Sequence, residues 1–311
     1  MDRRKIAVLM GGTSNEREVS LESGANVAAA LSGTGRYEVV PVKLDDDNLD
    51  ALPEGVDAVY IALHGGWGEN GGVQAALDAR GIPYTGPGAA ASRTAMDKIA
   101  TKRALEQCGV PTAAWYVANG EAASDAPRLP LPVVVKAPRD GSSVGVYKCT
   151  TREAYSRAVT AAVEIDARAN GGAGEALVEA FIPGREATVA VVGDEIWPAI
   201  EIVAPGGWYG YEEKYRSDST GYVFLADGTA ADRALEARIG AIAREAAAAL
   251  GCRGVCRVDF RIAEDLSPYV LELNTSPGFT AHSLVPKSGM RTGLTFAGVC
   301  ERILGAAACD R

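Results

Sequence analysis

The stretch YVLELNTSPGFTAHSLVP, residues 269–286, begins as an apolar strand and ends in polar residues. Within it, Glu272 and Asn274 lie on either side of Leu273. Because a strand points residues i and i+2 to the same face, one carboxylate and one amide are predicted to project together. A Thr-Ser-Pro-Gly turn follows at once, so the strand is predicted to end at a turn beside two oxygen-bearing side chains.

The strand before it carries a second polar pair. In CRVDFRI, residues 256–262, Arg257 and Asp259 again share one face. If the two strands pair, Asp259, Glu272 and Asn274 converge, and three hard oxygen ligands suit Mg²⁺. Two edge strands with polar residues facing water have the same spacing, so the pattern alone leaves both interpretations open.

The N-terminal part alternates strands with helices. The elements are expected, in chain order, at residues 5–12, 21–31, 37–44, 57–66 and 71–81. The strand at 57–66 is apolar nearly throughout, as parallel strands buried on both faces are. The alternation predicts an α/β unit with a parallel, Rossmann-like sheet, and we expect this domain to span residues 1–92.

The rest of the chain predicts two further units of mixed helix and strand. The second, residues 93–189, is expected to hold helices and strands at 96–109, 132–138, 152–165 and 175–184. The third, residues 190–311, is expected to hold most of a pair of strands, a long polar and aromatic connection, a helix and two further strands, at 186–203, 208–222, 231–251, 254–262 and 269–274. The fold class predicted is therefore α/β, with one parallel unit followed by two units of mixed helix and strand.

Two loops are candidates for binding phosphate. DGSSVG, residues 140–145, offers backbone N–H groups and hydroxyls, although it is not a Walker A sequence and an ordinary turn explains it equally well. It follows a strand that ends in Lys136, and a lysine there requires an anionic partner. A phosphate is the partner that this spacing favours.

The tips of two N-terminal strands are also polar. GGTSNEREVS, residues 11–20, and LHGGWGENG, residues 63–71, follow strands whose carboxyl ends are where open α/β sheets bind ligands. Ser14 or Asn15 could serve only to cap a helix. His64 lies where a strand meets a loop, which favours a site over core packing.

Composition excludes several classes of protein. The chain has 311 residues, a net charge of −9 and a sequence pI near 5.0. It contains no basic cluster longer than RRK at the N-terminus, so we expect no nucleic-acid partner. No apolar run approaches the 18 or so residues of a membrane span. The six cysteines form no CxxC pair, which argues against zinc and suits a reducing cytoplasm.

Eight motifs in order resemble the D-alanine–D-alanine ligase family of the ATP-grasp superfamily. They are GGTSNEREVSL, ALHGGWGENGGVQ, IPYTG, MDKIATK, GSSVGV, EKYRSDST, RVDF and ELNTSPGFTAHSLVP, and together they span essentially the whole chain. The resemblance implies a three-domain ATP-grasp architecture, in which a Rossmann-like domain precedes two α+β domains that clasp ATP.

The resemblance implies an activity as well. The family joins two D-alanines at the expense of ATP, through a D-alanyl phosphate, for peptidoglycan precursor synthesis. Two alternatives stay open: a ligase that accepts D-serine or D-lactate, and a nucleotide-binding module without catalysis. The intact Lys214-Tyr215 pair argues for an amine acceptor. The resemblance also implies a cytoplasmic enzyme and a homodimer.

The resemblance assigns residues to each subsite. The residues that would contact ATP are Lys98, Lys136, Ser142, Ser143, Glu179, Glu186 and Lys214. Those that would hold the two D-alanines are Glu16, His64, Lys214, Arg257, Ser283 and Leu284. Those with catalytic roles would be Glu16, Ser142, Tyr215, Arg257 and Gly278, of which Arg257 and the Gly278 amide would stabilise an oxyanion. Two Mg²⁺ or Mn²⁺ ions would be bound by Asp259, Glu272 and Asn274, with Glu272 bridging.

Overall fold

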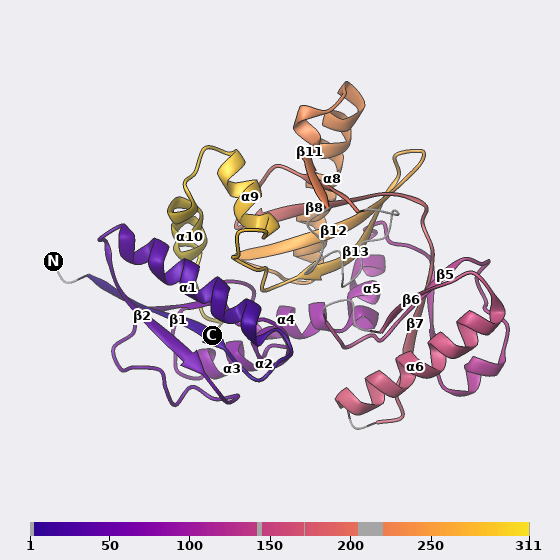
Figure 1. Ribbon diagram of the computed structural model, residues 1–311, viewed down its shortest axis with the longest axis horizontal. Coiled ribbons are helices and arrows are strands. Elements are labelled where there is room, and N and C mark those ends of the chain that lie inside the picture. Colours follow the sequence, from indigo (N-terminus) through magenta and orange to yellow (C-terminus); the bar gives the residue numbers. More distant parts are fainter. Residues whose placement is uncertain (1–2, 142–144, 171, 205–219, 311) are drawn as a thin grey trace.

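The computed structural model of the protein describes residues 3–141, 145–170, 172–204 and 220–310. Three β-sheets and the helices that cover them make up this part of the chain (Figure 1). Among the described residues, no helix is both long and apolar enough to cross a membrane.

The first sheet is parallel, as the alternation of strands and helices predicts. Its strands are β1 (Arg4–Gly11), β2 (Tyr37–Leu44) and β3 (Ala58–Ile61), in the order β2-β1-β3. Helices α1 (Arg17–Gly33), α2 (Gly66–Glu69) and α3 (Gly72–Asp78) follow β1 and β3. Strand β3 is buried at every position, which is the reason for its unbroken apolar run.

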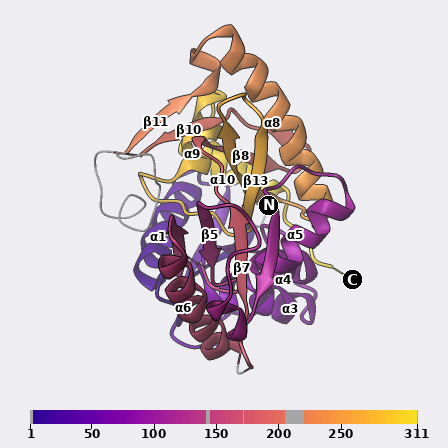
Figure 2. The same ribbon diagram turned by 90° about the vertical axis from the view of Figure 1, so that its right-hand side faces the viewer.

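The second sheet is antiparallel. Its order is β4-β7-β5-β6, formed by β4 (Trp115–Ala118), β7 (Ala176–Ala180), β5 (Val133–Lys136) and β6 (Val146–Cys149). Helix α6 (Arg152–Asn170) packs across β5 and β7 (Figure 2). Strands β4 and β6 were not predicted, because each is four residues long and most of its residues are only partly buried.

The third sheet is also antiparallel and contains the two polar strands. Its strands are β8 (Gly184–Val192), β9 (Glu195–Ile196), β10 (Ile200–Val203), β11 (Gly221–Phe224), β12 (Val255–Ala263) and β13 (Pro268–Asn274). Helix α8 (Ala230–Ala249), which a Thr229–Asp232 capping box begins, covers one face and shares a core with β8 and β12. The opposite face of β12 is therefore left for polar side chains.

Short helices join the sheets. They are α4 (Ala89–Met96) and α5 (Lys98–Gln107) in the first half of the chain, α9 (Leu284–Arg291) and α10 (Phe296–Gly305) at its end, and the 3₁₀ turns η1 (Glu121–Ser124) and η3 (Leu225–Asp227). The domain end expected at residue 92 falls inside α4, which begins at Ala89.

The end of the chain returns to the first sheet. Val299 and Ile303 of α10 share a hydrophobic core with Ile6 of β1 and Val27 of α1, and α10 lies beside α1 in Figure 1. The third sheet starts at Gly184, ahead of residue 190. The predicted fold class is confirmed, since one parallel sheet is followed by antiparallel sheets with helices. The boundaries 1–92, 93–189 and 190–311 stay a proposal.

Candidate active site

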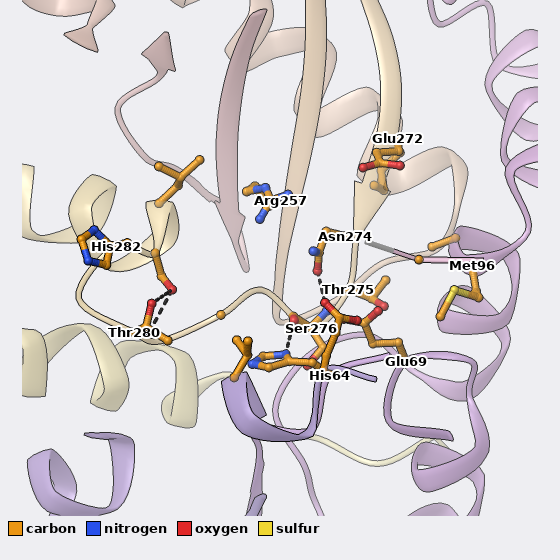
Figure 3. A pocket seen from close by; sticks show the side chains of 18 of the residues that line it. His64, Glu69, Met96, Arg257, Glu272, Asn274, Thr275, Ser276, Thr280 and His282 are labelled. Carbon is orange, nitrogen blue, oxygen red and sulfur yellow. Dashed lines mark hydrogen bonds between the residues drawn. The ribbon is translucent and has the colours of Figure 1, made fainter. Parts of the chain in front are cut away.

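A cavity of about 410 Å³ lies where the three parts of the fold meet. Its walls come from the tip of the first sheet, from α4 and α5, from the loop after β5, and from β12, β13 and the turn that follows them. Figure 3 shows Arg257 and Glu272 on one side of this space and His64 and Glu69 on the other, while Asn274 Oδ1 accepts the backbone N–H of Ser276 at 3.0 Å where the two sides meet.

The two polar strands pair, which was one of the two arrangements that their sequence pattern left open. Strands β12 and β13 are antiparallel neighbours, with Asp259 opposite Glu272 and Arg257 opposite Asn274. Directly opposed residues on paired strands have Cβ atoms about 4.5–5.5 Å apart. Asp259, Glu272 and Asn274 are therefore brought together, although Asp259 does not line the cavity.

A β-bulge on β13 allows Glu272 and Asn274 to face the cavity. Asp259 pairs with Glu272 but Phe260 pairs with Val270, so Leu271 is an extra residue on β13. Val270 and Leu273 consequently both pack into the core under α8, although residues three apart in a regular strand face opposite sides. Glu272 and Asn274 then line the cavity. The apolar–polar alternation of the sequence did not predict this bulge.

Asp259 is held by two neighbours. Arg257 donates to both carboxylate oxygens, from Nε at 2.9 Å and Nη2 at 2.7 Å, and the Thr188 hydroxyl donates at 2.6 Å. Asp259, Glu272 and Asn274 supply two carboxylates and an amide oxygen on one side of the sheet, and this oxygen donor set fits Mg²⁺ or Mn²⁺. Binding of a cation by Asp259 would compete with the Arg257 ion pair.

Glu179 on β7 lies between two lysines. Its carboxylate forms ion pairs with Lys102 of α5 and Lys136 of β5, and the Glu179 side chain is 2% exposed. Burial by itself would raise the pKa of Glu179, but the two ammonium groups outweigh it and lower the pKa to about 2. Glu179 and Lys136 therefore stay charged, and neither lines the cavity.

Glu186 and Lys98, two further predicted ATP contacts, lie on different elements. Glu186 of β8 accepts a hydrogen bond from Arg261 at 3.4 Å, on the face of the sheet that carries Asp259. Lys98 begins α5, lines the cavity, and donates from Nζ to the carbonyl of Asp140 at 2.6 Å.

His64 anchors the turn after β13. Its Nδ1 donates to the carbonyl of Ser276 at 2.9 Å, so its Nε2, 3.1 Å from Ser23 Oγ, is the acceptor of the neutral ring. Ser23 Oγ in turn accepts the backbone N–H of Phe279 at 3.0 Å. Burial lowers the pKa of His64, which keeps the ring neutral. This relay holds both ends of the segment that carries Gly278.

Gly278 and Ser283 lie against each other across the turn. A Cβ added to Gly278 would come within 2.9 Å of Ser283 Oγ, so a larger residue there would displace the Ser283 hydroxyl. Ser283 Oγ also accepts the backbone N–H of Thr280 at 2.9 Å. Ser283 precedes α9, and Leu284 begins it. All three predicted residues line the cavity.

Glu69 is a cavity residue that the sequence analysis missed. Burial and the neighbouring Glu16 carboxylate raise the pKa of Glu69 from 4.5 to about 8, against the backbone N–H of Gly65 and the charge of Arg257. Glu16 Oε2 lies 2.8 Å from the position that a Cβ on Gly65 would occupy. Glu69 could have been identified from the sequence, because it is the carboxylate in LHGGWGENG, the motif that also contains His64.

The predicted residues divide into three groups. Those that line the cavity are Glu16, His64, Lys98, Arg257, Glu272, Asn274, Gly278, Ser283 and Leu284. Those that the structure describes elsewhere are Lys136, Glu179, Glu186 and Asp259. Ser142, Ser143, Lys214 and Tyr215 lie outside the described residues.

Two family models match the chain. The model described as D-ala D-ala ligase N-terminus matches residues 5–52, and the model described as D-ala D-ala ligase C-terminus matches residues 105–305. The D-alanine–D-alanine ligase of Bordetella pertussis is 47% identical over 315 residues, covering 98% of this chain and 95% of that protein. The Haemophilus ducreyi ligase is 42% identical over 305 residues, covering 96% and 97%.

Solved structures agree with the sequence relatives. The crystal structure of D-alanine–D-alanine ligase from Bacillus anthracis has a TM-score of 0.83 at 31% identity, covering 97% of this chain and 96% of that one. The same organism's ligase complexed with ATP has a TM-score of 0.80 at 28% identity, covering 97% of each chain. VanG D-Ala:D-Ser ligase from Enterococcus faecalis has a TM-score of 0.81 at 27% identity, covering 98% and 99%.

Proposed function

The chain belongs to the D-alanine–D-alanine ligase family, and from this premise we propose how its residues carry out the family's reaction. The enzyme joins two D-alanines at the expense of ATP, and the dipeptide serves peptidoglycan synthesis. The observation that carries the residue assignments is the cavity in which Glu16, Arg257 and the Gly278 turn face a common space.

The first step is attack of one D-alanine carboxylate on the γ-phosphate of ATP, which gives D-alanyl phosphate and ADP. Glu16 binds the ammonium group of this D-alanine. Lys98 stabilises the charge on the phosphoryl oxygens, which is the main task of the protein in such a transfer. Lys136 belongs to the same subsite and is kept charged by Glu179.

The second step is attack of the other D-alanine amine on the acyl carbon; the bond to phosphate breaks, inorganic phosphate leaves, and the amine loses a proton as the peptide bond forms. The tetrahedral oxyanion requires hydrogen-bond donors, which Arg257 and the Gly278 N–H supply. Ser283 and the Leu284 backbone bind the carboxylate of the second D-alanine. The resemblance adds Lys214 to this subsite and gives Ser142, Ser143 and Tyr215 the task of closing the site against water.

A pair of divalent cations completes the proposed site. Asp259, Glu272 and Asn274 would bind two Mg²⁺ or Mn²⁺ ions, which neutralise phosphate charge when bound. The ribose and adenine contacts of ATP are assigned to Glu186 and to the segment around Glu179. We also propose that the enzyme is a homodimer and that it acts in the cytoplasm.

The test is release of ADP by the purified protein with ATP and Mg²⁺, with and without D-alanine, together with detection of the dipeptide by mass. We expect release that depends on D-alanine and a dipeptide product. D-Serine and D-lactate are compared as acceptors, and a preference for either would reject D-alanine as the second substrate. If none of these acids supports turnover, the alternative of a nucleotide-binding module without catalysis would be favoured.

The variant Glu272→Gln tests the metal assignment. It removes one charge from the proposed ligand set, and we expect turnover to fall at least ~100-fold, because altered metal ligation costs several kcal/mol of transition-state stabilisation. Glu264→Gln, at an exposed position in the turn between β12 and β13, is the control and should keep normal turnover. Normal activity in the Glu272 variant would contradict the metal site.

A further inference from the structure

Arg139 binds three carboxylates from three other segments of the chain. Its Nε donates to Asp97 at 2.8 Å, Nη1 to Asp166 at 2.9 Å, and Nη2 to Glu175 at 2.7 Å. Asp97 lies between α4 and α5, Asp166 lies on α6, and Glu175 precedes β7. We call these four residues the Arg139 cluster. None of them lines the cavity.

The cluster is built around the buried carboxylate of Asp166, and its most exposed member is Glu175, whose side chain is 41% exposed. Asp166 is 1% exposed and Arg139 is 29% exposed. The carboxylate of Asp166 also accepts the backbone N–H of Glu175 at 2.9 Å and the amide of Asn170 at 2.8 Å. Burial raises the pKa of Asp166, while the Glu175 amide and Arg139 act against that increase. The planar guanidinium thus has a fixed position.

Asp97 connects the cluster to Lys98. One oxygen of Asp97 binds Arg139, and the other accepts the backbone N–H groups of Ile99 at 2.9 Å and Ala100 at 3.1 Å, which caps α5. Lys98 is the first residue of that helix. The position of Asp97 therefore determines where the Lys98 side chain starts.

Lys98 also contacts the residues on both sides of Arg139. Its backbone N–H donates to the carbonyl of Pro138 at 2.9 Å, and its Nζ donates to the carbonyl of Asp140 at 2.6 Å. Lys98, Asp140 and Gly141 line the cavity. Two segments are thus joined in both directions. Arg139 binds Asp97, which is next to Lys98, and Lys98 binds Pro138 and Asp140, which are next to Arg139.

We propose that Arg139 is a positioning residue for ATP. It holds the Lys98 ammonium and the Asp140–Gly141 backbone where both can contact the ATP phosphates. The proposal rests on the assignment of Lys98 to ATP in the proposed function. Arg139 does not touch the nucleotide; it acts through Asp97 and through the chain next to it. A lysine at position 139 could reach one carboxylate, but it cannot present the forked geometry that joins three.

The experiment compares Arg139→Lys with Arg253→Lys. Arg253 is a matched control, because its side chain is 25% exposed and its guanidinium also joins three acceptors, Asp310, Tyr84 and Gly86, away from the cavity. We expect Arg139→Lys to raise the KM for ATP about tenfold, as for a loss of one charge-assisted contact, with the KM for D-alanine within about twofold of normal. The dissociation constant of ATP, measured by calorimetry, should rise by a similar factor.

A second variant covers the case in which Arg139→Lys folds poorly. Asp97→Asn keeps a good helix cap but removes the charge that binds Arg139, so it should also weaken ATP binding and leave D-alanine binding unchanged. Equal losses of melting temperature in the Arg139 and Arg253 variants, with normal ATP binding in both, would reduce the cluster to fold stability and overturn the proposal.

Lys98→Met separates this inference from the proposed function. If Lys98→Met weakens ATP binding and the Arg139 and Asp97 variants do not, the positioning role is wrong and the assignment of Lys98 stands. If Lys98→Met leaves ATP binding unchanged, the assignment of Lys98 is wrong and the positioning role is rejected with it.

Discussion

At the scale of single residues, the site places like charges close together. Glu16 and Glu69 both lie near Gly65, and Arg257 and Glu272 face them across the cavity. Two carboxylates in a partly desolvated site cannot both ionise freely. Burial, which is the largest cause, and the nearby Glu16 carboxylate together raise the pKa of Glu69 to about 8.

The stability of the protein without ligands should therefore depend on Glu69. Between its ordinary pKa of 4.5 and about 8, the folded protein keeps a proton on Glu69 that the unfolded chain has released. Stability from this group is complete below pH 4.5 and is lost as the pH rises through 8. In Glu69→Gln, the decline in unfolding free energy between pH 5 and pH 8.5 should be smaller, as measured with urea in the presence of a chelator. An unchanged decline would contradict the raised pKa.

At the scale of elements, one buried ionic bridge joins a helix to a sheet. Lys102 of α5 and Lys136 of β5 meet at Glu179 of β7. The pKa of Glu179 is about 2, so its contribution to stability is present above its ordinary value of 4.5 and is lost as the pH falls through 2. The bridge aligns α5, which carries Lys98, with the sheet that carries Lys136.

Breaking this bridge should be costly. Glu179→Gln leaves two buried ammonium groups without a counter-charge, and removal of one member of a buried ion pair costs about 3–5 kcal/mol. The control is Asp227→Asn, which breaks the exposed pair with Arg291 and should cost no more than about 1 kcal/mol. Urea unfolding at pH 7 measures both. Similar small losses in the two variants would show that Glu179 is not the counter-ion of the lysines.

At the scale of the whole molecule, the end of the chain ties the first sheet to the third. Ala308 exchanges two backbone hydrogen bonds with Tyr84, at 3.0 and 3.1 Å, and Arg253 binds Asp310 at 3.0 Å. Arg253 lies just before β12, which carries Arg257 and Asp259. The terminal residues thus hold β12 next to the sheet that carries Glu16 at its tip.

A chain that ends at Ala307 should lose this connection. It lacks both hydrogen bonds and the carboxylate partner of Arg253, so we expect the unfolding free energy to fall by about 2–4 kcal/mol. Asp310→Asn, which keeps the backbone pairing, should cost less than half as much. Equal unfolding midpoints in urea for the 311-residue chain and the shortened chain would contradict a structural role for residues 308–311.

The sequence predicted much of the fold because its signals are local. The unbroken apolar run of β3 and the alternation in β12 reflect burial along one strand, and both strands are present as expected. Strands β4 and β6 and helix α4 were missed, since short, half-polar segments acquire their structure from the neighbours against which they pack.

Some features of the site could likewise be predicted from local sequence signals, and others depend on how the chain folds. The family, the parallel first sheet, and the shared face of Glu272 and Asn274 could be predicted from the sequence, because motif order and strand periodicity are properties of the chain. The folded structure was needed to show that a bulge turns those two side chains to the cavity, that Glu179 lies between two lysines, and that Glu69 lies close to Glu16. Strand register, burial and the repulsion between charges depend on residues far apart in the sequence, and they take effect only when folding brings these residues together.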